Sequence, residues 1–528
     1  MTARTPVAPG YGAGPAASHP VPPVAGSFAR MPLTGPLRTR WLDPALVGLV
    51  ALAVYGMHGF DADLGRDQGT FVYGGQQLAH GVPPYVGIFN SVGPVVDVVT
   101  GAGIRVGSAL GLDDVRATRV TYLLVSVLAV VALSVLARDA LRSRAAGLVV
   151  PALFSTFAGF LSLASDGPRE KTVMVLLLEL ALLLMLRRRW FWAGILSAAA
   201  ILTWQPVVLT AVAAAVSAIL TSNGRRPRAA AAYVAGALLP TALVTLLYLV
   251  SGHLTLAWWG FVLINIGYTT QPNIVQSWDL LTAGYGASLV LVVVGWLLSV
   301  ALGAGALTRR RRTRSAHDAE IARALLVLGT GGLVAGLWSC FAVNGAPDLF
   351  VLLPFAALGA GAALILVVRT LPIATVRRVI AAVALLAVAA AGAESVTTRS
   401  SDLVAERQTV TRVAAALPAG STILSVNSPE VLVLLERRNP YRYQLSTSAT
   451  APFMDDHLEG GLAAYADRIA RLRPALIAVG HLSVDDWLRP VLRADYVRVG
   501  PGDHWVWYAS TDLDPDVRRR LRQATAGR

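Results

Sequence analysis

The chain has 528 residues, of which 55% are hydrophobic and only 14% are charged, and its formal net charge is +14. Soluble domains carry roughly 25% charged residues, so this composition excludes an ordinary soluble enzyme. Apolar runs recur from residue 43 to residue 394, and about 20 apolar residues in a helix span a bilayer. The composition therefore predicts a mainly α-helical, polytopic membrane protein.

The basic residues gather between the apolar runs, which suits membrane topology better than nucleic-acid binding. Lys171 is the one lysine among the 45 basic residues. The single cysteine, Cys340, excludes an intrachain disulfide and a cysteine-based metal site, and the eight histidines show no zinc-ligand spacing. We expect no nucleic-acid partner, no metal and no cofactor.

Residues 1–40 contain eight prolines among many alanines and glycines, which predicts a disordered tail. The first apolar run begins only near residue 43 and lacks a small-residue cleavage site, so we expect no cleavable signal peptide. Hydropathy predicts a transmembrane domain over residues 41–394 with about eleven helices. Their expected positions are 43–59, 119–137, 145–164, 171–186, 190–203, 206–221, 229–250, 283–306, 322–341, 349–368 and 378–394.

The arginine clusters between these spans predict the orientation of the chain. One side collects 22 basic residues and the other side seven, and cytoplasmic loops carry the excess of Lys and Arg. We therefore expect a multi-pass protein of the plasma membrane, with a cytoplasmic N-terminus and everything after residue 394 outside. The apolar stretch 94–112 carries Asp97 and Arg105 and would reverse this arrangement if it crossed. It is predicted to be an amphipathic helix at the outer interface.

After residue 394 the pattern changes to alternating strand-like and helical segments. Strands are expected at 421–427, 475–480, 496–499 and 504–509, and helices at 429–438 and 484–495. This alternation predicts a small extracytoplasmic α/β domain over residues 395–528. Polar residues gather on the same side of the membrane, in three predicted outer loops at 60–118, 165–171 and 251–282.

The first outer loop carries the most specific motif. It reads GRDQGTFVY at 65–73, QQLAHGVPPY at 76–85 and VGP at 92–94. An acidic residue after the first span, an aromatic a few positions on, Leu-x-x-Gly-x-x-Pro-Tyr and a later proline resemble the GT-C superfamily of membrane glycosyltransferases. The dolichyl-phosphate-mannose mannosyltransferase-like branch is the most similar. Arg119, the acidic second loop and the hairpin Thr203-Trp204-Gln205-Pro206 extend the resemblance, which is good over residues 60–210.

The resemblance implies transfer of a sugar, mannose or another hexose, from a polyprenyl-phosphate donor on the outer face. The acceptor hydroxyl would belong to a glycan, a glycolipid or a protein. Such a reaction needs a base that removes the proton of the acceptor hydroxyl and a positive charge that stabilises the departing phosphate. Asp67 matches the family's catalytic position and is expected to be the base. The alternative is that Asp67 merely caps the following helix.

This chain departs from the family pattern beside the expected base. Where relatives have Asp-Glu, it has Asp67-Gln68, so a metal clamped by two adjacent carboxylates is not supported. Asp61 and Asp63 precede the motif and would either substitute as acids or solvate the end of the helix, and the second role is favoured.

The short second loop holds the candidate phosphate ligands. Lys171 and Arg169 are expected to bind the donor phosphate, with Asp166 and Glu170 as auxiliary acids, since lysine suits phosphate as a point charge. The alternative is a charged turn at the head-group boundary, with Lys171 snorkelling. A charge at a loop edge adds little stability, so Lys171 is expected to matter for donor binding more than for folding.

Further residues are candidates for weaker roles. Glu179 lies within a predicted span and is expected to be a protonated or paired structural acid. Tryptophans of the third loop would stack on sugars, although tryptophan is enriched at membrane interfaces without any ligand. The expected sugar or acceptor contacts are Gln68, Tyr73, Tyr85, Gln205, Trp258, Trp259 and Arg442.

Two other function classes stay open. A secondary transporter or lipid flippase typically shows repeated halves and polar sites at the bilayer midplane. Here no repeat is visible and the polar residues lie in the outer loops, which disfavours that class. A non-catalytic relative that binds glycans through its outer domain is the remaining alternative.

Overall fold

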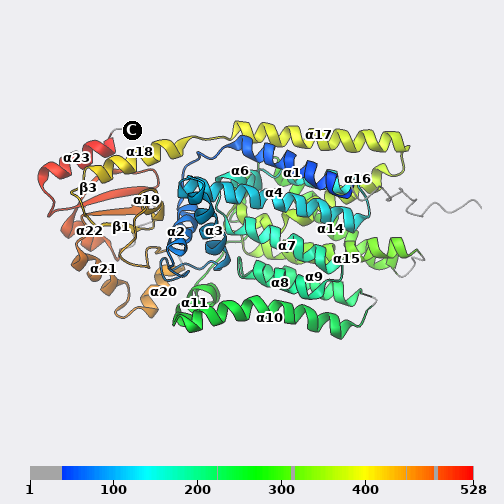
Figure 1. The fold of residues 1–528 in the computed structure, drawn as a ribbon, viewed down its shortest axis with the longest axis horizontal. Helices are drawn as coiled ribbons and strands as arrows, with labels where there is room; N and C mark the ends of the chain where they lie inside the picture. The colour runs from blue at the N-terminus through cyan, green and yellow to red at the C-terminus, as the bar shows by residue number, and fades with distance from the viewer. Residues whose placement is uncertain (1–38, 223, 311–314, 448, 481–485, 527–528) are drawn as a thin grey trace, which may run out of the picture.

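The computed structural model describes residues 39–222, 224–310, 315–447, 449–480 and 486–526 (Figure 1). The predicted disordered tail therefore lies outside the described residues, apart from its last two. A bundle of long helices occupies one end of the molecule and a small α/β domain the other (Figure 1). Two shorter helices, α2 (Arg66–Ala79) and α3 (Val95–Ala109), lie between them. The chain is thus a helical polytopic membrane protein with a C-terminal α/β unit, as predicted.

Each predicted span corresponds to a helix or a bent pair of helices among the described residues. The helices are α1 (Thr39–His58), α4 (Asp114–Leu141), α5 (Ala146–Phe154) with α6 (Ala158–Asp166), α7 (Glu170–Leu186), α8 (Trp190–Ile201), α9 (Val207–Leu220), α10 (Arg226–Val250), α14 (Ser288–Arg310), α15 (Ala316–Phe341), α16 (Leu353–Val368) and α17 (Ile373–Thr397). Six helices of the described chain are long and apolar enough to cross a membrane, and the pair α5–α6, bent by 79°, adds a seventh. Helix length alone supports fewer crossings than eleven, because α7, α8, α9 and α16 have 17, 12, 14 and 16 residues.

Small residues let the helices of the bundle pack closely. A Cβ atom on Gly295 of α14 would overlap the backbone of Ala356 in α16, and one on Gly194 of α8 would overlap Tyr233 in α10. Lipid tails are as apolar as leucine, so close van der Waals packing holds such helices together. Helices α10 and α17 lie on opposite outer faces of the bundle (Figure 1) and expose leucines there, as lipid-facing helices do.

The stretch 94–112 forms α3, which has 15 residues and packs between α2 and α4. Its two charged side chains, Asp97 and Arg105, both contact helix α2. Asp97 is buried against Gly74 of α2, and burial raises the pKa of Asp97 to about 7. Arg105 donates hydrogen bonds to the carbonyl of Ala79 at the end of α2. The prediction of a non-crossing helix beside the outer loops agrees with this position.

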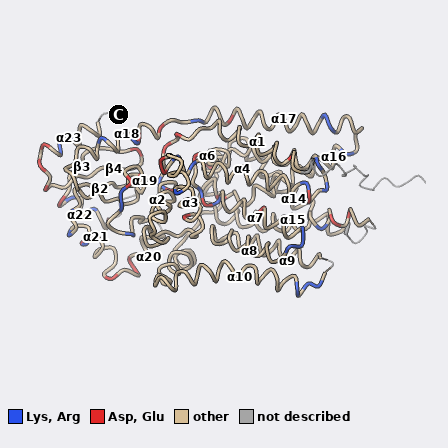
Figure 2. The backbone as a smooth tube through the Cα atoms, in the orientation of Figure 1, with Lys and Arg blue, Asp and Glu red and all other residues tan. Residues whose placement is uncertain are grey.

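Basic residues concentrate at the end of the bundle that is remote from the α/β domain (Figure 2). The clusters 187–189 and 225–228 lie there, at the end of α7 and the beginning of α10. The predicted outer loops lie at the opposite end, beside α2 and α3. This separation is the one that the predicted topology requires, and which end faces the cytoplasm stays a prediction.

A four-stranded sheet forms the core of the described part of the α/β domain. The strands β1 (Ile423–Val426), β2 (Leu476–Gly480), β3 (Tyr496–Pro501) and β4 (Trp505–Ser510) follow the order β1-β2-β4-β3. Strands β1 and β2 are parallel, and β4 is antiparallel to both of its neighbours. All four strands lie within two residues of their predicted positions.

The helices of this domain agree less well with prediction. The expected helix 429–438 ends early, as α19 (Pro429–Leu434), and the described part of 484–495 contains α22 (Arg489–Asp495). Sequence analysis missed α18 (Asp402–Ala415), α20 (Thr450–His457), α21 (Gly461–Leu472) and α23 (Pro515–Ala526). It also missed the short helices of the third loop and of the loop after α15, which are α11 (Leu254–Trp258), the π-helix η1 (Trp259–Leu263), α12 (Ile264–Gly267), α13 (Trp278–Tyr285) and the 3-10 helix η2 (Ala346–Val351).

The α/β domain packs directly on α2 through α19 (Figure 1). A Cβ atom on Gly69 would stand 2.7 Å from the backbone nitrogen of Glu430, so glycine permits this close approach. The Tyr73 hydroxyl accepts a hydrogen bond of 2.8 Å from the backbone N–H of Asn439. Helix α2 is thereby held between α3 and the α/β domain.

Candidate active site

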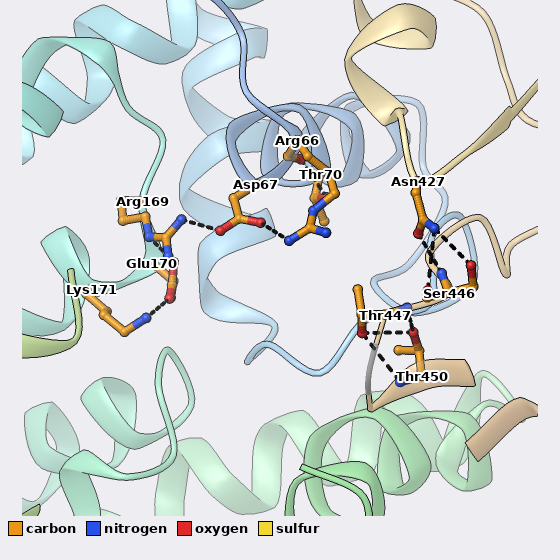
Figure 3. Close-up of polar contacts among 10 residues, drawn as sticks. All are labelled: Arg66, Asp67, Thr70, Arg169, Glu170, Lys171, Asn427, Ser446, Thr447 and Thr450. Carbon is orange, nitrogen blue, oxygen red and sulfur yellow. Dashed lines mark hydrogen bonds and ion pairs between the residues drawn. The ribbon is translucent and has the colours of Figure 1, made fainter. Parts of the chain in front are cut away.

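Asp67 is the second residue of α2, and both of its carboxylate oxygens contact arginine (Figure 3). Oδ2 lies 2.6 Å from Nη1 of Arg169, and Oδ1 lies 3.2 Å from Nη2 of Arg66. The N-cap of α2 is Gly65, and no side chain of the described residues caps it. Asp67 therefore does not cap the helix, and its carboxylate serves the two ion pairs instead.

Arg169 continues this contact into a row of alternating charges. Its Nε lies 3.3 Å from Oε2 of Glu170, Glu170 also contacts Lys171, and Nζ of Lys171 lies 3.0 Å from Oδ1 of Asp348 in η2. We call these six residues the charge chain: Arg66, Asp67, Arg169, Glu170, Lys171 and Asp348. Its three cations and three carboxylates sum to a formal charge of zero.

The side chains of the charge chain differ in accessibility, with Lys171 and Glu170 the most buried and Asp67 the most exposed. The exposed fractions are 6% for Lys171, 5% for Glu170, 13% for Asp348, 16% for Arg169, 29% for Arg66 and 42% for Asp67. The ammonium of Lys171 also lies 5.4 Å from the ring centre of Trp204. Lys171 is thus neither at an exposed loop edge nor snorkelling, and the accessible end of the charge chain is the Arg66–Asp67 pair.

The two arginines control the protonation state of Asp67. Burial by itself would raise the pKa of Asp67, but the charges of Arg169 and Arg66 hold that pKa well below its ordinary value. Asp67 is therefore ionised throughout the physiological pH range. The same attraction weakens Asp67 as a base for as long as both arginines stay in contact with it.

The loop between α6 and α7 is anchored at its beginning by a buried pair. Asp166 at the end of α6 lies 2.7 Å from Nε2 of His58 at the end of α1, and Nδ1 of His58 lies 3.2 Å from the carbonyl of Ser395 in α17. This anchor places Arg169 beside Asp67. Of the four charged residues predicted in the second loop, Arg169, Glu170 and Lys171 join Asp67, whereas Asp166 faces His58.

Arg119 fixes the chain segment that leads into α2. Its buried guanidinium donates hydrogen bonds to the carbonyls of Phe60, at 2.6 Å, and of Asp63, at 3.0 Å. The carboxylate of Asp63 lies 2.6 Å from Nε2 of His504 in the α/β domain, and that of Asp61 lies 3.5 Å from Arg116. Among the described residues, the carboxylates of Asp61 and Asp63 contact no cation of the charge chain.

The other predicted contact residues are spread over the surroundings. Gln205 donates hydrogen bonds of 3.1 Å to the carbonyls of Ser91 and Phe261, which ties two loops together. The Tyr85 hydroxyl donates to the carbonyl of Val92 at 2.7 Å. These contacts are structural in character. The sugar and acceptor roles of Gln68, Tyr73, Tyr85, Gln205, Trp258, Trp259 and Arg442 stay predictions.

The remaining aromatic and acidic candidates, Trp258, Trp259 and Glu179, lie in different environments. Trp259 packs against Phe453 and His457 of α20, whereas Trp258 is largely exposed. Glu179 is fully buried in α7, and neither of its carboxylate oxygens has a hydrogen-bond partner among the described residues. This position agrees with a protonated structural acid and lies apart from the charge chain.

Hydroxyl residues of the α/β domain lie in the same region as the charge chain (Figure 3). Thr447 and Thr450 lie on the side opposite Glu170 and Lys171. Asn427 holds their loop, since its Oδ1 accepts a hydrogen bond of 2.7 Å from the backbone of Ser446 and its Nδ2 donates one of 2.9 Å to the Ser446 hydroxyl. Sequence reasoning assigned no role to these residues.

Sequence reasoning also missed three contributors to the charge chain and its anchor. Arg66 stood in the motif without a role, Asp348 lies just before a predicted span, and His58 lies near the end of the first span. An acidic or basic side chain at the outer end of a span is the signal that points to Asp348 and His58. Their partners follow only from the way in which the helices pack.

Within the described ranges, no three His, Cys, Asp or Glu side chains are grouped as metal ligands would be. The carboxylates of Asp67, Glu170 and Asp348 each contact a cation instead. The expectation of a reaction without a metal or cofactor stays a prediction.

No family model and no curated protein matches the chain. Among solved structures, ArnT from Cupriavidus metallidurans bound to undecaprenyl phosphate is similar with a TM-score of 0.58 and 15% identity, over 90% of this chain and 99% of that chain. The archaeal oligosaccharyltransferase AglB from Archaeoglobus fulgidus, in complex with an inhibitory peptide and a dolichol-phosphate, is similar with a TM-score of 0.52 and 13% identity, over 92% of this chain and 78% of that chain. The resemblance stated from the first outer loop is therefore confirmed at the level of the fold: this chain has the GT-C fold of membrane glycosyltransferases.

Proposed function

We propose that the protein is an integral-membrane glycosyltransferase that moves a sugar from a polyprenyl-phosphate donor to an acceptor hydroxyl at the outer face. The observation that carries this proposal is the contact between Asp67 of the first outer loop and Arg169 of the second. This contact brings together a carboxylate that can accept a proton and a cation that can bind a phosphate. Both lie at the end of the bundle where the α/β domain packs. The GT-C fold supports the same reaction class, because the similar ArnT and AglB structures contain undecaprenyl phosphate and a dolichol-phosphate.

The donor is already activated, because its sugar is attached to a phosphate that leaves as an anion. In the proposed reaction the bond between the sugar C1 and the phosphate oxygen breaks, and its electron pair departs with the polyprenyl phosphate. Arg169 stabilises this charge, and Lys171 supports Arg169 by holding Glu170 and Asp348 in place. The lipid tail stays in the bilayer beside the helices.

The acceptor oxygen forms the new bond to the sugar C1 and transfers its proton to the carboxylate of Asp67. A general base of this kind contributes about 10²–10⁴-fold to a rate. The exposed fraction of Asp67, 42%, is the largest in the charge chain and leaves it accessible to an acceptor. A glycan, a glycolipid and a protein are all acceptors of the required chemistry.

The transporter alternative is not favoured by the position of these charges. The charge chain lies beside α2 and the α/β domain, at one end of the bundle, whereas transporter sites lie near the bilayer midplane. The finer identity of the sugar, mannose or another hexose, rests on the resemblance of the first loop alone.

The test is to incubate the purified protein in lipid nanodiscs with synthetic polyprenyl-phosphate mannose and other polyprenyl-phosphate hexoses. Release of polyprenyl phosphate and glycosylation of an added acceptor would support the proposal, and the donor with the highest kcat/KM would identify the sugar. Absence of transfer from every donor by a folded, monodisperse protein would contradict it. A reporter fused after residue 526 tests the proposed topology, and a cytoplasmic signal would reverse the assignment of the loops.

A further inference from the structure

The three cations of the charge chain are not equally available to a ligand. Lys171 contacts two carboxylates and is 6% exposed, and Arg169 also contacts two and is 16% exposed. Among the described residues, Arg66 forms an ion pair only with Asp67, at a distance of 3.2 Å, and is 29% exposed. Arg66 is therefore the cation held least tightly.

The guanidinium of Arg66 also has unused hydrogen-bonding capacity. Its Nη1 atom is buried and has no hydrogen-bond partner among the described residues, while Nη2 contacts Asp67. A buried donor without a partner is costly, so such an atom points to a group that is bound during function. Arginine presents several donors in a planar fork, which matches the oxygens of a phosphate.

The neutral charge balance of the charge chain determines how a phosphate is accommodated. Its three cations are already matched by three carboxylates, so an incoming phosphate adds uncompensated negative charge. The phosphate is bound only if one cation turns from its carboxylate toward the ligand. Arg66 is the most exposed of the three cations and contacts a single carboxylate of the charge chain, so its contact with Asp67 is the one most readily exchanged.

We propose that Arg66 is the first ligand of the donor phosphate and exchanges Asp67 for that phosphate when the donor binds. This inference rests on the proposed function and assigns the phosphate contact to a residue that sequence analysis left without a role. Arg169 keeps Asp67 in position during the exchange, since its contact of 2.6 Å is the shorter one.

The exchange also activates the base. In the free protein, Asp67 is faced by Arg66 on its own helix, by Arg169 from the loop before α7 and by Glu430 from α19. Burial raises the pKa of Glu430 well above its ordinary value, which favours its neutral form. Loss of the Arg66 contact and arrival of a phosphate both increase the proton affinity of Asp67. Asp67 thus becomes a stronger base only when a donor is in place.

The first experiment measures binding of undecaprenyl phosphate to the full-length protein in nanodiscs. Arg66→Gln is expected to weaken binding by about ten-fold or more, as expected for loss of a charged hydrogen bond. The matched control is Arg116→Gln, an exposed arginine that contacts Asp61, and it is expected to bind as the wild type does. Undecaprenol, which lacks the phosphate, is expected to bind the wild type and Arg66→Gln equally.

The second experiment uses the wild-type protein, so it also decides the matter if Arg66→Gln does not fold. The pH dependence of kcat/KM for the donor reports on the free protein, and that of kcat on the donor-bound protein. We expect the acid limb of kcat to lie at higher pH than the acid limb of kcat/KM.

Equal affinity of Arg66→Gln and the wild type for undecaprenyl phosphate would overturn the inference and leave the proposed function intact. Acid limbs that coincide would also overturn it. If the wild type neither binds undecaprenyl phosphate nor transfers any sugar, the proposed function fails and this inference fails with it.

Discussion

Replacement of Asp67 by asparagine separates the proposed chemistry from the stability of the site. Asparagine has nearly the same shape, but its amide cannot take a proton from an acceptor hydroxyl at neutral pH. A general base contributes about 10²–10⁴-fold to a rate, so transfer by Asp67→Asn is expected to fall by that factor. The contribution of Asp67 as a helix cap does not complicate the test, because Gly65 occupies the N-cap position.

The cost in stability is expected to be small. Asp67 is 42% exposed and Arg66 29% exposed, so solvent screens the ion pair that they form, and exposed pairs contribute about 0–1 kcal/mol. Arg169 keeps its contact of 3.3 Å with Glu170 after the substitution. The melting temperature of Asp67→Asn should therefore lie near that of the wild type.

The assay measures the initial rate of polyprenyl-phosphate release from a saturating sugar donor, with the binding of undecaprenyl phosphate measured on the same preparation. Asp61→Asn and Asp63→Asn are the controls, since their carboxylates contact Arg116 and His504 and not the charge chain. Both controls are expected to retain most of the activity. Near wild-type transfer by Asp67→Asn would remove Asp67 from the mechanism and make Glu170 the next candidate, because Asp166 is occupied by His58.

Three further predictions concern stability and domain docking. Lys171→Met leaves the largely buried carboxylate of Asp348 without its cation and leaves Glu170 with Arg169 as its remaining described cation. Thermal unfolding should therefore show a loss of up to about 3–5 kcal/mol, contrary to the small cost expected of a loop-edge charge, and an unchanged melting temperature would contradict this. Gly69→Ala places a Cβ 2.7 Å from the backbone of Glu430. Such overpacking costs about 1–3 kcal/mol, so both the transfer rate and the melting temperature should fall. The control Gly56→Ala has no atom within 4 Å of the added Cβ and should change neither quantity. The hydrogen bond between His504 and Asp63 raises the pKa of His504 and lowers that of Asp63. Protonated His504 therefore stabilises the folded protein below the ordinary histidine pKa, and this stabilisation is lost as the pH rises through the raised pKa of His504. Melting curves of the wild type and His504→Gln should accordingly converge on the alkaline side, and a constant difference up to pH 9 would refute the reasoning.

The sequence predicted the elements of this protein well wherever a local pattern determines them. Hydropathy located a helix or bent pair at every expected span, and the alternation of apolar and polar residues located all four strands to within two residues. The short helix α20 of the α/β domain was missed because it carries little hydrophobic periodicity of its own. Helix α21 is strongly amphipathic, so its pattern was present in the sequence and was overlooked. The motif at 65–73 indicated the GT-C fold correctly.

The sequence by itself also determined which charged residues are present in the outer loops, and it placed Asp67 and Arg169 among the candidates. Only the tertiary structure decided which of these charges meet. Asp348 lies far from Lys171 along the chain, and the two become neighbours because η2 packs against the start of α7. The same packing buries Lys171 and leaves Arg66 and Asp67 accessible. The strength and availability of a charge depend on its burial and its partners, and both are properties of the folded chain that no local pattern contains.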